Sequence, residues 1–339
     1  MSKNVLDALG EVLTGNPNVL ILPHNDPDPD AIGAAVGLNH LLKEIFQVDS
    51  WIAYKGLIER AENKALVQYL RNPLKIVNQT DFQAASMIAL VDTQPGAGNN
   101  SLPPNKQADI VIDHHILQPA PKDVLFSDIR PELGSTSTIL TNYLQEAGLE
   151  PSAQLATALF FGIKTDTRGL SRNANPSDVN AYFYLQSRVD VNALAQIEQA
   201  QVPLEYFQSI DAAIHAAKVF DENIVIAYLG KLSYPDLGAE LADFFMRLKG
   251  VQWVLCMGVF RGELILSMRS RNKKIGAGKL ITQIIGDKGT AGGHGNMSAG
   301  HIELAKEDDP QQMALYLEKT MLINLKGTPD VEHKRIIGL

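Results

Sequence analysis

The sequence predicts an α/β protein with a parallel sheet in its N-terminal part and a smaller α/β domain after it. Short, nearly continuous apolar runs alternate with segments of helical periodicity through residues 18–165, a pattern typical of a parallel sheet covered on both faces. A polar, helix-like stretch follows, and a second alternation of strands and helices begins near residue 220. The 339 residues suffice for two domains. We therefore expect a first domain at 1–190, a helical linker at 191–218 and a second domain at 219–339.

The expected elements of the first domain follow from apolar spacing. The strands are uninterrupted apolar runs: 18–23, 50–54, 87–91, 109–112 and a short one at 123–126. The helices repeat apolar residues every three to four positions: 4–14, 31–46, 58–71, 134–146 and 152–165. Residues 176–219 are polar and helical in pattern. The chain therefore passes from the first sheet to the second through helices.

The second domain is expected to begin with a strand and to contain a hairpin. The hairpin joins 251–260 to 263–268 and turns at Arg261-Gly262. The other expected elements are strands at 223–229 and 299–304 and helices at 239–248, 277–285 and 309–322. A glycine-rich loop precedes the strand at 299–304.

Composition limits the function classes. With 45% hydrophobic and 20% charged residues the chain is an ordinary soluble protein, and its net charge of −8 argues against a general nucleic-acid coat or long duplex partner. A short anionic substrate is still possible. Cys256, the single cysteine, leaves no internal disulfide or thiolate metal site. Without a signal-peptide core or an apolar run near the ~20 residues of a bilayer span, we expect a cytoplasmic protein with no membrane partner.

The most informative stretch is an acidic loop between the first strand and the following helix. It reads His24-Asn25-Asp26-Pro27-Asp28-Pro29-Asp30. The prolines stiffen the loop, and carboxylates held so close repel one another unless a cation or proton compensates them. An EF-hand is rejected, since Ala31 and Gly37 stand where that loop needs glycine and glutamate.

Further acids and histidines follow other elements. Asp92 ends one strand, Asp113-His114-His115 ends the next, and Asp166 ends a helix. Taken alone, Asp92 and Asp166 have a plain alternative as caps or turn residues. Ligands of parallel sheets gather beyond the carboxyl ends of the strands, so these side chains are expected to meet there.

The donor set indicates divalent metal. Carboxylates and imidazoles suit Mn, Fe, Zn or Mg in a catalytic site better than a structural zinc. Four carboxylates are too many for one catalytic ion and about right for two that share an aspartate. The candidate ligands are His24, Asp28, Asp30, Asp92, His114 and Asp166.

Two other segments are candidates for contact with an anionic substrate. A basic stretch, Ser267-Met268-Arg269-Ser270-Arg271-Asn272-Lys273-Lys274, is either a solvated loop or a phosphate clamp. Gly292-Gly293-His294 offers backbone amides and an imidazole donor. Ser135, Thr136 and Ser137 open a helix and are expected to be caps, with substrate contact as the alternative. Gly276-Ala277-Gly278-Lys279 lacks the remaining P-loop residues and is rejected as one.

These motifs, in this order, resemble the DHH phosphoesterase superfamily. The segment from Gly292 to Gly300 resembles the glycine–histidine signature of the associated C-terminal domain, the DHHA1 type. The resemblance spans nearly the whole chain, and it implies an active site in the cleft between the two domains.

Carried over residue by residue, the resemblance implies two divalent ions, usually Mn²⁺. His24 and Asp28 would hold one ion, and Asp30, His114 and Asp166 the other, with Asp92 bridging both. Asp113 would orient its neighbouring histidine, the role expected beside a metal-bound imidazole, and His115 would meet the substrate phosphate rather than a metal. In the second domain, Arg269 is favoured as the phosphate clamp, with Arg271, Gly292, Gly293 and His294 beside it.

The expected function is hydrolysis of phosphoester bonds in short nucleotidic substrates. Similar proteins degrade very short RNA oligomers, as oligoribonucleases do, and dephosphorylate 3′-phosphoadenosine 5′-phosphate. The alternatives are cleavage of cyclic dinucleotides, hydrolysis of pyrophosphate or polyphosphate by an exopolyphosphatase-related protein, and a nucleotide-binding regulatory module with a degenerate site. Nothing in the sequence decides between a monomer and a homodimer.

Overall fold

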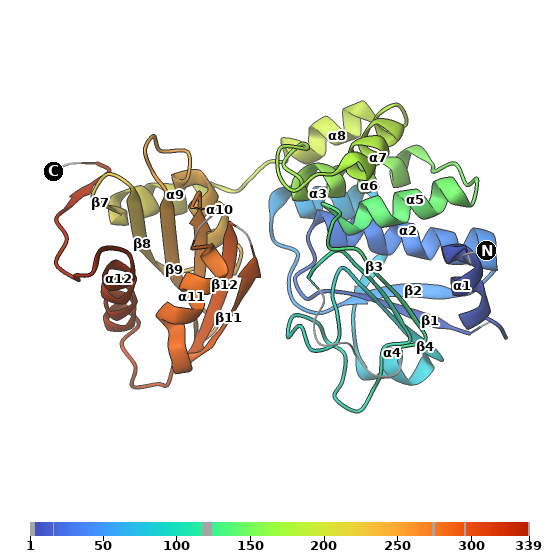
Figure 1. Cartoon of the computed structure of the whole chain (residues 1–339), viewed down its shortest axis with the longest axis horizontal. Helices are drawn as coiled ribbons and strands as arrows, with labels where there is room; N and C mark the ends of the chain where they lie inside the picture. The colour runs from blue at the N-terminus through green and yellow to red at the C-terminus, as the bar shows by residue number, and fades with distance from the viewer. Residues whose placement is uncertain (1–3, 16, 117–123, 273–274, 295, 338–339) are drawn as a thin grey trace. The chain divides into compact units, whose positions relative to one another are not determined.

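The computed structural model describes residues 4–15, 17–116, 124–272, 275–294 and 296–337. The chain forms two compact units, Met1–Gln201 and Val202–Leu339 (Figure 1), here called the first and second unit. The segment expected as a helical linker contains one helix of each unit, α8 (Val191–Glu198) and α9 (Leu204–Ala216). Among the described residues, no helix has both the length and the apolar character needed to cross a membrane.

The first unit contains the expected parallel sheet. Its strands run in the order β3-β2-β1-β4-β5-β6, and every neighbouring pair is parallel. The strands are β1 (Val19–Pro23), β2 (Ser50–Tyr54), β3 (Leu74–Ile76), β4 (Met87–Val91), β5 (Ile110–Asp113) and β6 (Phe126–Ile129). The helices are α1 (Val5–Val12), α2 (Pro29–Phe46), α3 (Ala61–Tyr69), α4 (Gln79–Ala84), α5 (Thr136–Glu146), α6 (Ala153–Asp166), α7 (Pro176–Gln186) and α8.

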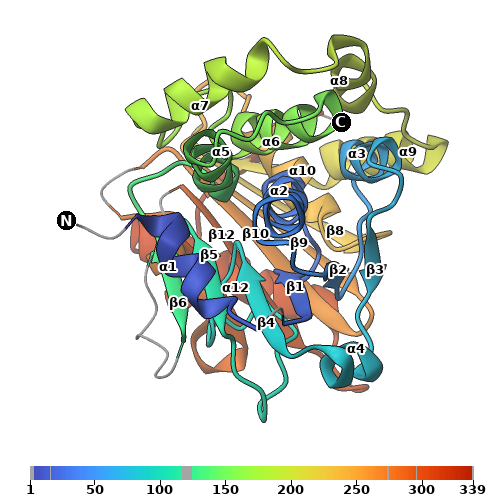
Figure 2. The same cartoon turned by 90° about the vertical axis from the view of Figure 1, so that its right-hand side faces the viewer.

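Both faces of this sheet are buried, as its continuous apolar strands require. In β1, Val19 and Ile21 pack into the larger core under α2, α5 and α6, whereas Leu20 and Leu22 pack into a smaller core on the opposite face. Figure 2 shows α2 and α5 on one side of β1 and β4, and α4 on the other. The two cores fix the strand register, and with it the edge at which the strands end.

The second unit has a mixed sheet. Its strand order is β11-β12-β10-β9-β8-β7-β13, and only β8 and β9 pair in parallel among the described strands. The strands are β7 (Lys218–Phe220), β8 (Ile224–Lys231), β9 (Trp253–Phe260), β10 (Glu263–Ser270), β11 (Thr290–His294), β12 (Met297–Glu303) and β13 (His333–Arg335). The helices α11 (Ala277–Ile285) and α12 (Pro310–Lys326) cover one face, and α9 and α10 (Leu237–Phe245) cover the other.

The observed strands differ from the expected ones where the sequence has only a weak apolar pattern. The strand expected at 123–126 overlaps β6 only at Phe126, since β6 runs on to Ile129, and residues 117–123 lie outside the described residues. β3 was not expected, because only Leu74 of its three residues is buried. The expected glycine-rich loop is strand β11, where Gly292 and Gly293 pair with β12. Glycine has no side chain to produce an alternating pattern, so such an edge strand has no sequence signal.

Candidate metal centre

The candidate ligands meet at the point where the strand order of the first sheet reverses. From β1 the chain continues outward to β2 and β3, and it then returns to β4 on the other side of β1. Such a switch point leaves a crevice beyond the carboxyl ends of the two strands. His24 directly follows β1, Asp92 directly follows β4, and Asp113 ends β5.

A first group of ligand atoms consists of His24, Asp28 and Asp92. Nε2 of His24 lies 3.7 Å from Oδ1 of Asp28 and 3.5 Å from Oδ2 of Asp92. Asp28 is also the N-cap of α2, and its Oδ1 accepts hydrogen bonds from the backbone N–H groups of Asp30 and Ala31. The cap explains why α2 begins at Pro29, and it fixes the carboxylate that faces His24.

A second group consists of Asp30, His114 and Asp166. Nε2 of His114 lies 3.9 Å, 3.5 Å and 3.3 Å from carboxylate oxygens of Asp30, Asp92 and Asp166. This nitrogen is buried and has no hydrogen-bond partner, while Nδ1 of the same ring lies 3.2 Å from the carbonyl oxygen of Leu133. A buried imidazole nitrogen that has no hydrogen-bond partner and is surrounded by carboxylates has the environment expected of a metal ligand.

Asp92 belongs to both groups. Its Oδ2 faces His24, and its Oδ1 faces His114 at the same distance of 3.5 Å. The residue is 1% exposed and has a positive φ of 59°, and its N–H donates to the carbonyl of Ile112 on β5. The two oxygens of one fixed carboxylate therefore point to two neighbouring sets of ligands.

The charges of the cluster are not balanced within it. Burial would lower the pKa of His24, but the hydrogen bond and charge of Asp28, with the charge of Asp92, raise that pKa to about 10. Burial raises the pKa of Asp92, and burial with the charges of Asp92 and Asp166 raises the pKa of Asp30 well above its usual value. Carboxylates this crowded are stable only with protons or cations among them. The donor atoms are carboxylate oxygens and imidazole nitrogens, which suit a divalent metal ion, so the residues present fit a metal site.

In the Asp113-His114-His115 turn, the carboxylate of Asp113 accepts hydrogen bonds and belongs to neither group of candidate ligand atoms. Oδ1 of Asp113 accepts from Nδ1 of His115 at 2.8 Å and from the N–H of His114 at 2.8 Å. Oδ2 accepts from Nε2 of Gln94 at 2.7 Å. The carboxylate thus orients the ring of His115, whereas the carbonyl of Leu133 faces the ring of His114. Gln94 was not expected from the sequence, and its only signal is its position two residues after Asp92.

The start of α5 bonds to two of the candidate ligands, Asp30 and Asp92. Asp30 is fully buried, and its carboxylate accepts the backbone N–H groups of Thr136 and Ser137 at 2.7 Å and 2.8 Å. The hydroxyl of Thr136 donates to Oδ1 of Asp92 at 2.7 Å. Ser135 is the N-cap of α5, as its residue type predicts. The contacts of Thr136 were missed because neither partner is near it in sequence.

Comparison with known proteins agrees with this geometry. Residues 18–163 match the family described as DHH family, N-terminal domain. The first unit is therefore a DHH-family domain. A solved structure of an exopolyphosphatase-related protein from Bacteroides fragilis shares the fold of this DHH protein, with a TM-score of 0.72, 17% identity, and coverage of 93% of this chain and 95% of that one.

Two relatives extend the comparison. The DHH chain is 37% identical over 289 residues to an uncharacterized protein of Methanocaldococcus jannaschii, covering 84% of this chain and 58% of the relative. It is 27% identical over 308 residues to a cyclic-di-AMP phosphodiesterase of Bacillus subtilis, covering 85% of this chain and 45% of the relative. The chain thus spans about half the length of the curated relatives it matches.

In the second unit of this DHH protein, the two arginines of the basic stretch (residues 267–274) both have partners within the unit. Arg269 is buried, and its guanidinium donates to both carboxylate oxygens of Asp243, at 3.0 Å and 3.1 Å. Nη2 of Arg271 donates to the carbonyl of Met246 at 2.6 Å. Lys273 and Lys274 lie outside the described residues.

The glycines of the β11–β12 hairpin have a structural role of their own. Gly293 has a φ of +136°, and a side chain there would lie 2.4 Å from the Cα of Ser298. Gly292 is exposed on β11 with open space around it. The side chain of His294 lies outside the described part of the structure. Gly293 is therefore required by the hairpin whether or not an anion binds to it.

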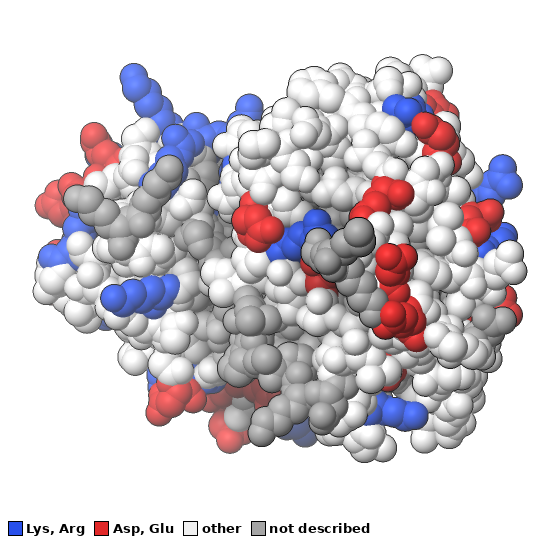
Figure 3. Space-filling view, turned by 45° about the vertical axis from the view of Figure 1, so that its right-hand side comes forward, with Lys and Arg blue, Asp and Glu red and all other residues white. Residues whose placement is uncertain are grey.

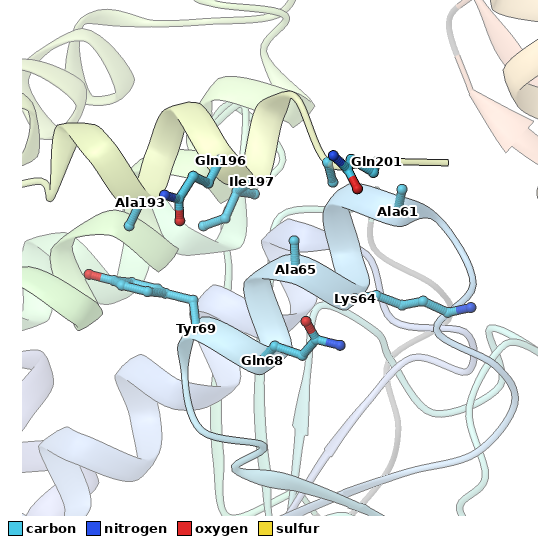
Figure 4. A pocket seen from close by; sticks show the side chains of 10 residues that line it. Ala61, Lys64, Ala65, Gln68, Tyr69, Ala193, Gln196, Ile197 and Gln201 are labelled. Carbon is cyan, nitrogen blue, oxygen red and sulfur yellow. The ribbon is translucent and has the colours of Figure 1, made fainter. Parts of the chain in front are cut away.

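The surface of the first unit has a groove away from the candidate ligands. A groove of about 610 Å³ between α3 and α8 is lined mostly by alanine and glutamine side chains, together with Lys64, Tyr69 and Ile197 (Figure 4). Its described lining contains no carboxylate and no imidazole, so the groove is separate from the metal centre.

On the face shown in Figure 3, acidic and basic side chains are interspersed among uncharged surface and form no continuous basic field.

Proposed function

We propose that this protein is a metal-dependent phosphohydrolase that cleaves phosphoester bonds of short nucleotidic substrates. The observation that carries the proposal is the carboxylate of Asp92, whose two oxygens lie 3.5 Å from the imidazoles of His24 and His114. A shared carboxylate between two ligand groups is the arrangement on which two-metal phosphoryl chemistry depends.

The residues divide into two ligand sets around Asp92. His24 and Asp28 would hold one divalent ion, and Asp30, His114 and Asp166 the other, with Mn²⁺ suited to this mixture of oxygen and imidazole donors. When bound, such ions supply a nucleophile from water at neutral pH and neutralise charge on the phosphate.

His115 is assigned to the phosphate. Its Nδ1 is bonded to Asp113, which orients the ring beside the ligand sets. Burial would lower the pKa of His115, but the hydrogen bond that the ring donates to Asp113 and the charge of Asp92 raise this pKa, so the ring carries a proton more readily than an ordinary histidine. A charged donor beside the centre favours an anionic substrate. Asp113 acts by holding this ring.

The second unit would add substrate contacts through Arg269, Arg271, Gly292, Gly293 and His294. For Arg269, the proposal requires the phosphate to bind beside Asp243 or to compete with it for the guanidinium. The DHHA1 resemblance of this unit supports the assignment.

A cyclic dinucleotide is the second candidate substrate. It is favoured by the similarity to the Bacillus subtilis cyclic-di-AMP phosphodiesterase, which extends over 85% of this chain and therefore over both units. Polyphosphate or pyrophosphate hydrolysis is the remaining hydrolase alternative.

A panel assay with added Mn²⁺ tests these candidates. It compares a dinucleotide RNA, 3′-phosphoadenosine 5′-phosphate, cyclic di-AMP and tripolyphosphate, each with and without a chelator. We expect chelator-sensitive cleavage of one or both of the first two. Selective cleavage of cyclic di-AMP would transfer the assignment to the second candidate, and cleavage of tripolyphosphate alone would refute the nucleotidic one.

A further inference from the structure

One short segment, Leu133–Ser137, contacts all four parts of the chain that supply ligands. The carbonyl of Leu133 faces Nδ1 of His114 at 3.2 Å, and the backbone N–H groups of Thr136 and Ser137 donate to Asp30. The hydroxyl of Thr136 donates to Asp92. These contacts join residues that are between 19 and 107 positions apart in sequence.

The fourth contact is steric. A side chain on Gly134 would lie 2.6 Å from Cγ2 of Thr167, the residue after Asp166. The backbone of Gly134 also donates to both oxygens of Asp178, at 3.0 Å and 2.9 Å. Asp178 is fully buried and accepts from the hydroxyl of Thr138 as well, so it anchors the segment to α7.

Two buried threonines in the first turn of α5 donate their hydroxyls to distant carboxylates: Thr136 bonds to Asp92, a candidate metal ligand, and Thr138 bonds to Asp178, which belongs to neither ligand set. Thr141 and Thr157, both fully buried, donate to carbonyls one helical turn back, at Ser137 and Ala153. Thr136 is the first residue of α5 and has no helical carbonyl behind it. Its hydroxyl bonds instead to a carboxylate 44 positions away, at 2.7 Å.

We propose that Thr136 is a positioning residue for the metal centre: its hydroxyl fixes the rotation of the Asp92 carboxylate so that the two oxygens face the two ligand sets. The proposal rests on the metal-dependent function proposed above. With Oδ1 held by Thr136, Oδ2 is turned to His24, and a carboxylate free to rotate would present this pair less often. Outer hydrogen bonds of this kind typically change metal affinity by about 10- to 100-fold.

The test is a Mn²⁺ titration of the full chain, followed by calorimetry, with Thr136→Val as the main variant. Valine has the size of threonine and keeps the backbone N–H that donates to Asp30, so only the hydroxyl is lost. We expect Mn²⁺ affinity to fall by about 10- to 100-fold. Thr136→Ser restores the hydroxyl and should recover affinity close to that of the wild type.

Thr141→Val is the matched control. It makes the same substitution in the same helix, at an equally buried position whose hydroxyl reaches a backbone carbonyl. We expect wild-type Mn²⁺ affinity. Thr136→Ala, measured beside it, gives a second variant without the added methyl group if the valine protein does not fold, and thermal unfolding in chelator checks the folding of each.

The outcomes separate the two proposals. Unchanged Mn²⁺ affinity in the folded Thr136 variants, with a wild type that binds, overturns the role of Thr136 and leaves the proposed function intact. An equal loss in Thr141→Val also overturns it, because the effect would then belong to the helix. A wild type that binds no Mn²⁺ overturns both.

Discussion

The acidic cluster of the first unit and the basic stretch of the second are both dense in charge, but their charges are satisfied differently. In the cluster, Nε2 of His114 is buried without a hydrogen-bond partner among three carboxylates. In the basic stretch, the guanidinium of Arg269 already has both oxygens of Asp243. The cluster therefore needs a ligand from outside the protein, whereas the charge of Arg269 is already compensated by Asp243. Unbalanced charge is the stronger indication of a binding site.

The largest effect is expected from Asp92→Asn. The change keeps the shape of the side chain and removes the charge shared by the two ligand sets. Mn²⁺-dependent turnover should fall by about 1000-fold, which corresponds to roughly 4 kcal/mol of transition-state stabilisation. In the wild type, Mn²⁺ at 100 times its Kd should raise the free energy of unfolding by about 2.7 kcal/mol. Kinetics and urea unfolding with and without Mn²⁺ measure both.

Chelated protein supplies the control for that variant. With no metal bound, Asp92→Asn removes one negative charge from a crowded cluster, so its stability should equal or exceed that of the chelated wild type. A metal-free variant much less stable than the wild type would mean that Asp92 supports the fold, and the difference between the two regions would then disappear.

Much of this cluster could be predicted from the sequence, because its residues directly follow or end the apolar runs that form the strands. His24, Asp92 and Asp113 each directly follow or end an apolar run, and a parallel sheet brings the carboxyl ends of its strands to one edge. Metal-ligand residue types at those ends were enough to predict a shared site. The six strands of the sheet were largely found for the same reason, with the short β3 as the exception.

The supporting contacts could not be predicted. Gln94, Thr136 and Asp178 act through hydrogen bonds to residues 19 to 106 positions away, and their residue types are ordinary for caps and turns. The pairing of Arg269 with Asp243 could not be predicted either, because a run of basic residues does not indicate which acidic residues pack against it. Residue type gives the chemistry of a side chain, but only the fold gives its partner.

An intermediate effect is expected in the second unit, where paired variants test whether Arg269 binds substrate. Arg269→Ala should raise KM by about tenfold, equivalent to about 1.4 kcal/mol, with the metal content unchanged. Asp243→Asn keeps the guanidinium and removes its partner, so it should not raise KM. Steady-state kinetics on the substrate found in the panel assay measure both.

If KM is unchanged in Arg269→Ala while both variants lose about 1 kcal/mol of stability, the ion pair belongs to the fold alone. The basic stretch would then carry no part of the site, and the contrast with the acidic cluster would become complete.

The smallest effect concerns Asp81, a buried carboxylate whose charge is compensated inside the protein. Its oxygens accept from Lys75 at 2.6 Å, from Nε1 of Trp51 and from the N–H of Asn78. Burial would raise its pKa, but these three partners lower it. Because the folded-state pKa lies below the unfolded value of about 3.9, the stabilisation is present above that value and is lost as the pH falls through the folded pKa.

Asp81→Asn should therefore cost about 1 kcal/mol at pH 7, and the cost should shrink below about pH 4. Urea unfolding of the chelated protein from pH 7 to pH 3 measures it. A cost that does not change with pH would show that the charge of Asp81 contributes nothing beyond its hydrogen bonds. Asp81 and Asp92 are both buried carboxylates, and removing the charge should destabilise only the one whose partners are already in the chain.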